Sequence, residues 1–422
     1  MRPSNRGKVE MKIESIRKFT RQLLLLATAA TMGSPLFAQH ALTVMPHLQP
    51  GSDEPYAFMR PHYVIHQTQA SSAATPPSSA FAPNQILHAY GFDQISNQGA
   101  KQVIGIVDAY DDPNAEADLG TFSKQYNLPA CTTANGCFKK VFQTGRQPVA
   151  NANWSVEISL DVQWVHAIAP QATIVLVETN SNALSDLISG VDVAVRNGAS
   201  AVSMSWTSYE FSSESTFDNH FVSNTVTFLA ASGDAGTGVA YPASSPYVIG
   251  VGGTTLNASS NGTYQNETAW SGSGGGQSAY EHEPLYQSQF GIPDDSGAHR
   301  GVPDVAYDAN PTTGYAVYDS YGLNGTKGWF QVGGTSAAAP QWAALVAIAN
   351  SMRVTSRKTN LLSTGSVLYT LAKSNAAANF RPVTSGTNGS CGTLCSAMTG
   401  YDFVTGLGTP QAHALINALV AQ

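Results

Sequence analysis

The sequence has few charged side chains and no hydrophobic run long enough to cross a membrane. Charged residues make up 12% of the 422 residues, which is about half of the usual share in soluble domains. The apolar stretch 23–32 is shorter than the roughly 20 residues that a membrane-spanning helix needs, so no membrane span is expected. Hydrophobic residues nevertheless reach 42%, which argues against wholesale disorder and allows a large core.

Cysteine is also scarce, with four residues in two local pairs. The spacing of Cys131 with Cys137 and of Cys391 with Cys395 matches no zinc site. In an oxidising compartment the pairs predict two short-loop disulfides, whereas in a reducing compartment they would remain metal-free reduced pairs.

The first 38 residues are basic, then apolar, and end at the small residue Ala38. This order is typical of a secretory signal peptide, so we expect a secreted protein, extracellular or periplasmic. Without residues 1–38 the formal net charge falls from −7 to about −12. An acidic chain argues against nucleic acid or an anionic membrane as a partner, and we expect a monomer.

Residues 39–81 are rich in Pro, Ser, Ala, Gln and His and have no periodic apolar face. This composition predicts a short pro-segment or a flexible linker. Regular structure is expected to begin near Phe81, and residues 82–422 are expected to form the functional domain.

Further along the chain, short apolar strands alternate with helices. Segment 103–107 is a short apolar strand, 172–178 is expected to be a buried strand, and 154–168 repeats apolar residues at every fourth position. Repeated β-α-β units of this kind predict an α/β fold with a parallel β-sheet and helices on both faces. Residues 255–330 and 380–402 are rich in Gly, Asn, Ser and Tyr and are expected to form long ordered surface loops.

A glycine-rich string, Gly333-Gly334-Thr335-Ser336, leads directly into an apolar helix. The positive end of a helix dipole stabilises negative charge that develops beside a serine in this position, and the glycines let a substrate backbone approach closely. The string is consistent with a nucleophilic Ser336, although an ordinary helix N-cap has the same residues.

A nucleophilic serine needs a base within hydrogen-bond reach, and the usual histidine is missing. Asp108 ends a strand, as the aspartate of a Ser-His-Asp site would, but none of the ten histidines precedes a glycine. His166 lies on an apolar helix, where we expect it to be packed or half-exposed and not catalytic.

The same helix offers two carboxyl groups, Glu157 and Asp161, at a spacing of four residues. They share one helix face and repel each other. A solvated acidic stripe is the ordinary interpretation, but the apolar neighbours leave little room for one. Two close carboxyl groups in a partly buried site share a proton, and such a pair can accept a proton from a serine.

A third carboxyl group stands in Ser232-Gly233-Asp234-Ala235-Gly236, after an apolar strand. Such a string often forms nothing more than a turn. Its functional interpretation is an acid, Asp234, that points at the carbonyl group of a substrate.

These strings resemble those of the sedolisins, a family of serine-carboxyl peptidases with an elaborated subtilisin fold. The resemblance extends from about residue 82 to the C-terminus, and the strings come in the family's order. They are Trp154-x-x-Glu157-x-x-x-Asp161, Ser232-Gly233-Asp234-x-Gly236, 241–248 with 251–254, Gly274-Gly275-Gly276, 302–306, and Gly333-Gly334-Thr335-Ser336-x-x-x-Pro340.

The resemblance implies a subtilisin-like fold and a serine-type endopeptidase that acts on proteins or peptides. It assigns Ser336 as the nucleophile, Glu157 as the general base, Asp161 as the partner of that base, and Asp234 as the oxyanion-hole residue. Because a carboxylate cannot donate a hydrogen bond, Asp234 must be protonated to stabilise an oxyanion, so activity is expected to rise as the pH falls below neutral.

The resemblance also implies that substrate binds along the strand that contains Ser205, Trp206 and Thr207. Sedolisins often have glycine where this chain has Thr207, and a threonine there is expected to narrow the cleft. The family also carries a large folded pro-domain, for which residues 39–81 are too few.

Sedolisins generally bind calcium near the C-terminus. The resemblance assigns to this site the carboxylate of Asp402 and the backbone carbonyl groups of Val383, Met398 and Gly400. Pro382 stands where the family has a second carboxylate, and a hard cation binds more weakly to one carboxylate than to two.

Two other functions remain open at this stage. An ordinary subtilase would use Asp108 and a histidine, and its activity would survive the loss of Glu157. A secreted binding protein on an inactive peptidase fold would have no reason to keep all four residues of the expected catalytic set.

Overall fold

The fold is built around a mostly parallel sheet of eight strands. The computed structural model describes residues 42–43, 58–66, 74–293 and 298–422, all within one unit that spans 41–422. The sheet has the order β12-β11-β9-β7-β4-β6-β5, and β15 also pairs with β11. Its strands are β4 (Val103–Ala109), β5 (Phe138–Phe142), β6 (Thr173–Thr179), β7 (Ala201–Met204), β9 (Thr227–Ala231), β11 (Val248–Ala258), β12 (Tyr264–Ala269) and β15 (Val305–Asp308).

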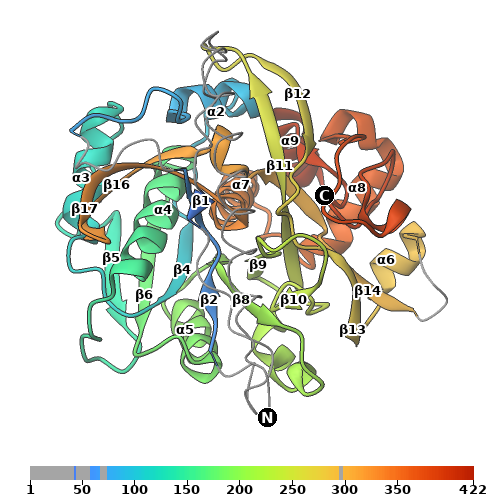
Figure 1. Cartoon of the computed structure of the whole chain (residues 1–422), viewed down its shortest axis with the longest axis horizontal. Coiled ribbons are helices and arrows are strands. Elements are labelled where there is room, and N and C mark those ends of the chain that lie inside the picture. Colours follow the sequence, from blue (N-terminus) through green and yellow to red (C-terminus); the bar gives the residue numbers. More distant parts are fainter. Residues whose placement is uncertain (1–41, 44–57, 67–73, 294–297) are drawn as a thin grey trace, which may run out of the picture. The chain divides into compact units, whose positions relative to one another are not determined.

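Helices cover both faces of this sheet, which confirms the expected α/β class. On one face α4 (Ala152–Ile168) packs against α7 (Thr335–Thr355) (Figure 1). On the other face lies α5 (Leu184–Arg196). Successive residues of β4 point to opposite faces, so that Ile106 joins the core beneath α4 and α7, whereas Val107 joins the core beneath α5.

Smaller elements surround these layers. The other helices are α2 (Pro83–Tyr90), α3 (Ala115–Gln125), α6 (Leu285–Phe290), α8 (Thr364–Asn379) and α9 (Ala412–Ala421). The other strands are β1 (Leu42–Thr43), β2 (Arg60–Pro61), β3 (Val64–His66), β8 (Trp206–Tyr209), β10 (Ala240–Tyr241), β13 (Gly276–His282), β14 (His299–Val302), β16 (Tyr315–Leu323), β17 (Thr326–Gly333), β18 (Phe380–Arg381) and β19 (Thr409–Pro410).

The prediction of a long surface loop over 255–330 is wrong. Its described residues include the whole of β12, β13, α6, β14, β15, β16 and the 3-10 helix 311–313 in addition to parts of β11 and β17, and its β15 lies in the parallel sheet. The composition that suggested a loop marks the turns between strands. Asn324 and Gly325, both left-handed, join β16 to β17 in the manner of a tight hairpin.

Regular structure also begins earlier than Phe81. Strand β2 pairs antiparallel with β8, and β3 pairs antiparallel with β17. Figure 1 shows the blue strand β2 beside the green strand β8, although the two are far apart in the sequence. These early strands depend on distant partners, which local composition does not reveal.

The cysteines form the two disulfides that their spacing predicted, Cys131–Cys137 and Cys391–Cys395. The expected signal peptide, 1–38, lies outside the described residues. Within the described part of the chain, no helix has both the length and the apolar character required to span a membrane.

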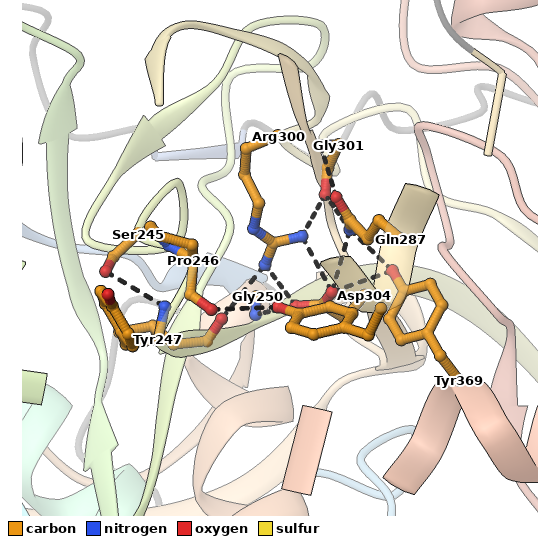
Figure 2. Close-up of polar contacts among 11 residues, drawn as sticks. Ser245, Pro246, Tyr247, Gly250, Gln287, Arg300, Gly301, Asp304 and Tyr369 are labelled. Atoms are coloured by element: carbon orange, nitrogen blue, oxygen red, sulfur yellow. Dashed lines mark hydrogen bonds and ion pairs between the residues drawn. The ribbon is translucent and has the colours of Figure 1, made fainter. Parts of the chain in front are cut away.

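A fully buried ion pair joins Arg300 of β14 to Asp304, which directly precedes β15. Asp304 also accepts hydrogen bonds from the backbone N–H of Gly250 at 2.8 Å and from the hydroxyl of Tyr369 at 2.9 Å. Figure 2 shows that the amide of Gln287 completes this arrangement. The string 302–306 therefore has a structural role, because it ties β11 to the C-terminal helices.

We predict that Arg300→Ala destabilises the fold by about 3–5 kcal/mol, because it leaves the carboxylate of Asp304 buried without its charge partner. The measurement is denaturant unfolding of the variant in a Ser336→Ala background, which prevents proteolysis. As the matched control, Arg146→Ala at an exposed position is expected to change the unfolding free energy by about 0.5 kcal/mol or less. Equal effects of the two substitutions would contradict the prediction.

A second polar cluster contains four carboxyl groups near the 3-10 helix that follows β8. They are Glu210, Glu214, Asp218 and Glu281. Burial raises the pKa of all four, and it raises those of Glu214 and Glu281 to about 8. Repulsion between neighbouring carboxyl groups adds to the rise for Glu214 and Glu281. The folded chain therefore holds these protons more tightly than the unfolded chain does.

We predict that the fold is more stable in mild acid than at alkaline pH. A raised pKa contributes stability that is complete below the usual carboxyl pKa of about 4 and is lost as the pH rises toward about 8. The melting temperature of the Ser336→Ala chain should fall by about 5 °C or more between about pH 5 and about pH 8. Glu214→Gln, which cannot ionise, should reduce this fall, and a higher melting temperature at pH 8 would refute the idea.

Candidate active site

The carboxyl ends of three neighbouring strands bring polar side chains to one edge of the sheet. Asp108 lies near the end of β4, Ser205 directly follows β7, and Asp234 follows β9. The order β9-β7-β4 makes these strands neighbours, and the carboxyl ends of parallel strands meet at the same edge. Side chains at every second position of a strand point to the same face of the sheet. Asp108 therefore points to the same face as Ile106, toward α4 and α7.

Helix α4 contributes Glu157 and Asp161, which lie one turn apart and are completely buried. Because every residue of 154–168 is buried, the pair is not a solvated stripe. Burial raises the pKa of both carboxyl groups well above the usual range, and the neighbouring Asp108 raises them further. Burial also raises the pKa of Asp108 to about 8. Three carboxyl groups thus occupy one water-poor site and compete for protons.

Ser336 lies in the first turn of α7. Its hydroxyl donates to the backbone oxygen of Ser205 at 3.2 Å, and its proximity to Glu157 opposes the rise in the pKa of that group. Within the described part of the chain, neither carboxyl oxygen of Glu157 has a hydrogen-bond partner of standard geometry. Glu157 therefore lies beside Ser336 and has capacity to accept the serine proton.

Ser205 connects the acid pair to the helix that carries Ser336. Its hydroxyl oxygen lies 2.9 Å from a carboxyl oxygen of Asp161 and 3.3 Å from the backbone oxygen of Ser336. That backbone oxygen lacks the usual donor four residues later, because Pro340 has no N–H. The Ser205 hydroxyl has one proton, so it donates to this oxygen while a protonated Asp161, whose pKa burial raises well above the usual range, donates to the Ser205 oxygen.

Asp234 is anchored through one carboxyl oxygen only. Its Oδ1 accepts hydrogen bonds from the backbone N–H and the hydroxyl of Thr335, both at 2.8 Å. Its Oδ2 has no partner among the described residues. Burial raises the pKa of Asp234 to about 7, so below that pH the group is neutral. Its proton then sits on Oδ2, since Oδ1 already accepts two hydrogen bonds.

Residues 58–66 lie across these groups. The backbone N–H of His62 is 3.3 Å from the backbone oxygen of Ser205 and 3.1 Å from the hydroxyl of Ser336. The backbone N–H of Ser336 in turn donates to the carbonyl oxygen of His62 at 3.0 Å. With this segment in place Ser336 is 0% exposed, so no other chain reaches it.

The residues expected to bind substrate lie where the early segment pairs. Thr207 is opposite Arg60, and Trp206 is opposite Pro61. The indole of Trp206 donates to a backbone oxygen of β4, which fixes β8 against the large sheet. The backbone of β8 thereby presents a fixed edge to an extended chain.

Among the described residues, no imidazole forms a hydrogen bond with the Ser336 hydroxyl. The ring Nε2 of His62 contacts the hydroxyl of Thr207, and the ring of His166 contacts the backbone oxygen of Pro129. Both carboxyl oxygens of Asp108 lack a hydrogen-bond partner in the described part. Among the residues that the structure describes, the Asp-His pair that an ordinary subtilase requires is therefore not formed.

Sequence reasoning missed two features of this site. It considered Asp108 only for a histidine-based site, although the alternation along β4 directs this side chain to the face of α4. It also passed over Thr335, which anchors Asp234 and precedes Ser336 directly. A hydroxyl residue beside the nucleophile was the available signal.

The expected calcium ligands form a C-terminal loop. Asp402 accepts hydrogen bonds from the backbone N–H groups of Met398, Val404 and Thr405, so N–H donors already occupy both of its carboxyl oxygens. Val383 packs into a small apolar cluster with Val404.

Pro382 and Gly400, two further positions of the expected calcium site, add no carboxylate to this loop. Pro382 has no oxygen in its side chain, and Gly400, which lies in a left-handed turn, has no side chain. The residues present therefore do not fit a calcium site of the family's kind, which needs a second carboxylate and free oxygen ligands.

A different acidic cluster lies on the side of α4 that faces α3. Asp112, Asp118 and Asp319 are buried, and their carboxyl oxygens lie within 4.8 Å of one another. Burial raises the pKa of all three. Each already accepts hydrogen bonds from the chain, for example from the backbone N–H of Ser320 to Asp118 at 2.8 Å.

The chain is similar to known peptidases. Residues 149–389 match the subtilase family. Kumamolisin from Bacillus sp. (strain MN-32) is 31% identical over 405 residues, which cover 86% of this chain and 68% of kumamolisin. Sedolisin from Pseudomonas sp. (strain 101) is 35% identical over 207 residues, which cover 43% of this chain and 33% of that protein.

A solved structure shows the same relationship. Pseudomonas sedolisin, described as a serine-carboxyl proteinase complexed with two molecules of pseudo-iodotyrostatin, has 28% identity and a TM-score of 0.69. The match covers 81% of this chain and 98% of the sedolisin chain. From the matched length, the similarity to kumamolisin and the shared fold, we conclude that this chain belongs to the subtilase family of serine peptidases and, within it, to the sedolisins.

Proposed function

We propose that this chain is a secreted serine endopeptidase with an acidic pH optimum, which cleaves proteins or peptides through an acyl-enzyme on Ser336. One observation carries the proposal. Three buried carboxyl groups, those of Glu157, Asp161 and Asp108, converge beside the hydroxyl of Ser336, while no described imidazole hydrogen-bonds to that hydroxyl.

In the first step Glu157 accepts the proton of the Ser336 hydroxyl as the oxygen attacks the substrate carbonyl. Glu157 must be ionised for this step, and Asp161 supports it by holding a shared proton. Two or three interacting carboxyl groups lose their protons in successive steps, and the pKa of each step is a property of the whole group and not of one residue. The group therefore keeps one negative charge over an acidic pH range, and activity falls when the last carboxylate is protonated.

The oxyanion that forms needs hydrogen-bond donors. The backbone N–H of Ser336, at the positive end of α7, is one donor. Asp234 is the second, through the proton on its Oδ2. Because burial raises the pKa of Asp234 to about 7, this donor is present below about pH 7 and is lost above it.

Substrate is proposed to extend along β8, pairing with the backbone of Ser205, Trp206 and Thr207 as an added antiparallel strand. We assign residues 1–38 to a signal peptide, 39–81 to a short pro-segment and 82–422 to the peptidase domain. The two disulfides support an oxidising compartment. A calcium ion is not part of this proposal, because the C-terminal loop does not supply its ligands.

We predict that cleavage of a fluorogenic peptide is fastest below about pH 7 and falls at higher pH as Asp234 ionises. Ser336→Ala and Glu157→Gln should each lower kcat by about 10³-fold or more. Asp93→Asn, which changes an exposed carboxylate, is the control and should leave the profile unchanged. An optimum near pH 8, or full activity of Glu157→Gln, would point to a histidine base.

Asp234 allows a sharper test, because Oδ1 and Oδ2 have different roles. In Asp234→Asn the amide oxygen can accept the hydrogen bonds from Thr335, while the amide nitrogen donates to the oxyanion at any pH. We predict that this variant stays active above pH 7, where the wild type loses activity. Asp234→Ala should lose about 10²–10³-fold in kcat at every pH.

The two variants also separate binding from chemistry, since KM should change little in either. Loss of activity in Asp234→Asn equal to that in Asp234→Ala would exclude Asp234 as a hydrogen-bond donor to the oxyanion. A protein that binds peptides tightly yet cleaves none under any condition would instead be an inactive binding protein on this fold.

A further inference from the structure

The end of helix α4 lies against a short loop that contains the first disulfide. The loop joins α3 to β5 and holds Cys131 and Cys137. His166 lies in the last turn of α4, the helix that also carries Glu157 and Asp161. The two sulfur atoms and a ring nitrogen of His166 all lie within 4.8 Å of one another. None of these three residues takes part in the proposed catalysis.

The ring of His166 has one nitrogen whose lone pair is unused. The residue is 0% exposed, and its Nε2 lies 2.8 Å from the backbone oxygen of Pro129. Because a carbonyl oxygen can only accept a hydrogen bond, Nε2 carries the proton and Nδ1 carries the lone pair. Burial lowers the pKa of the ring, which favours this neutral form. Nδ1 has no hydrogen-bond partner among the described residues, although two sulfur atoms lie close to the ring.

This arrangement has the features of a histidine that binds a metal ion. Such a histidine usually donates its other ring N–H to a backbone carbonyl or a carboxylate, which fixes the orientation of the ring. The hydrogen bond from His166 to Pro129 is of this kind. His166 also lies at the C-terminal end of α4, where the helix dipole favours a cation. The spacing of the two cysteines could not reveal this third ligand, because it comes from another element.

The loop is held in shape by hydrogen bonds as well as by the disulfide. The side chain of Asn135 accepts hydrogen bonds from the backbone N–H groups of Thr132 and Cys137, at 3.1 and 3.0 Å. It also donates to the backbone oxygen of Ala130 at 2.7 Å. The backbone oxygen of Cys137 accepts the N–H of Ile174 in β6 at 2.7 Å. Reduction of the disulfide therefore leaves the two thiols close together.

We propose that Cys131, Cys137 and Nδ1 of His166 bind a Zn²⁺ ion whenever the disulfide between the two cysteines is reduced. The inference goes beyond the proposed function and does not depend on it. Two thiolates and an imidazole select Zn²⁺ over Ca²⁺ and Mg²⁺, which prefer oxygen ligands. Tetrahedral Zn²⁺ holds such ligand atoms about 3.6–3.8 Å apart, which a group already within 4.8 Å reaches by a small shift. Three protein ligands leave the fourth position to water.

The exchange between the two states balances in atoms and electrons. A dithiol supplies two electrons and two protons to the disulfide and is itself oxidised to a disulfide. Zn²⁺ then displaces one proton from each thiol as two Zn–S bonds form, and it takes the lone pair of Nδ1 without a proton transfer. In the reverse direction an incoming disulfide accepts two electrons, the S–S bond forms again, Zn²⁺ leaves, and the reduced reagent takes protons from water. Cys137 is partly exposed, so these reagents reach the pair through it.

The two states tie the loop differently. The disulfide joins the loop only to itself, whereas zinc also joins it to α4 through His166. The sequence predicts a secreted protein, and a chain that awaits export is in a reducing compartment. There the ion holds the loop against the helix that carries Glu157 and Asp161. After export the disulfide replaces the ion.

The test uses the whole chain as its Ser336→Ala variant, which prevents proteolysis. The protein is reduced with a phosphine, separated from it in the absence of oxygen at about pH 7.5, where zinc competes well for thiols, and titrated with Zn²⁺ or Co²⁺. One zinc ion should stay bound to each chain. Co²⁺ should give a thiolate charge-transfer band in the near ultraviolet and the strong visible bands of a tetrahedral site. The oxidised chain should give neither result, and a folded, reduced chain that binds no zinc would overturn the inference.

The second cysteine pair supplies the matched control. Among the described residues, no histidine forms a metal-sized group with Cys391 and Cys395. Replacing both of these cysteines with serine should therefore leave zinc binding and the cobalt spectrum unchanged. The double variant Cys131→Ser, Cys137→Ser should lose both. Equal zinc binding by the two double variants would show that any free thiol pair, or another cluster, holds the ion, and the proposed site would be wrong.

His166→Gln tests the third ligand. Its amide N–H can still donate to the Pro129 oxygen, but the lone pair of Nδ1 is lost. The Kd of the reduced chain for zinc should rise by about 10²-fold or more, while the oxidised variant should still show a cooperative melting transition. Unchanged zinc affinity in this variant would exclude His166 as a ligand.

A second measurement needs no change at the histidine. Zinc in excess should raise the melting temperature of the reduced Ser336→Ala chain by several degrees, because the ion binds only the folded loop and helix together. The same addition should not raise the melting temperature of the Cys131→Ser, Cys137→Ser variant. An equal rise in both chains would place the ion elsewhere and contradict the inference.

Discussion

Removal of water from carboxyl groups is the constraint on which this site depends. Helix α4 is buried along its whole functional length, and α7 and the sheet leave Glu157, Asp161 and Asp108 without solvent to support their charge. In such surroundings a carboxyl group retains its proton until well above its usual pKa. Burial makes it costly for all of these carboxyl groups to be charged at once. They instead form a group of acids that exchanges protons with the serine at acidic pH.

The elements that could be predicted from the sequence are those that local pattern determines. The spacing of Glu157 and Asp161 on an apolar helix placed both on one buried face, and Gly333-Gly334-Thr335-Ser336 marked a helix N-terminus. The apolar strands of the parallel sheet were visible for the same reason. That Glu157, Asp161 and Ser336 come together could be inferred only from the resemblance. Helix α4 and the strand ends meet through tertiary packing between segments that are distant in the sequence.

The parts that could not be predicted depend on partners distant in sequence. Strands β2 and β3 form only because β8 and β17 offer them edges, so a segment rich in polar residues was taken for a linker. The region 255–330 was misjudged in a related way, since its glycines and asparagines mark turns between strands that gain stability by pairing. For Asp402, the residue type alone could not show that its oxygens are occupied by N–H groups of its own loop.

Strand β3 lies between β1 and β17, and this position has a mechanical consequence. Residues 63–66 fill the sheet beside the nucleophile. A long polypeptide that enters the cleft must displace this strand, and displacement exposes the unpaired edge of β17. The chain's own segment and an incoming substrate thus compete for one edge, so a substrate that leaves β3 in place is the easier one to accommodate.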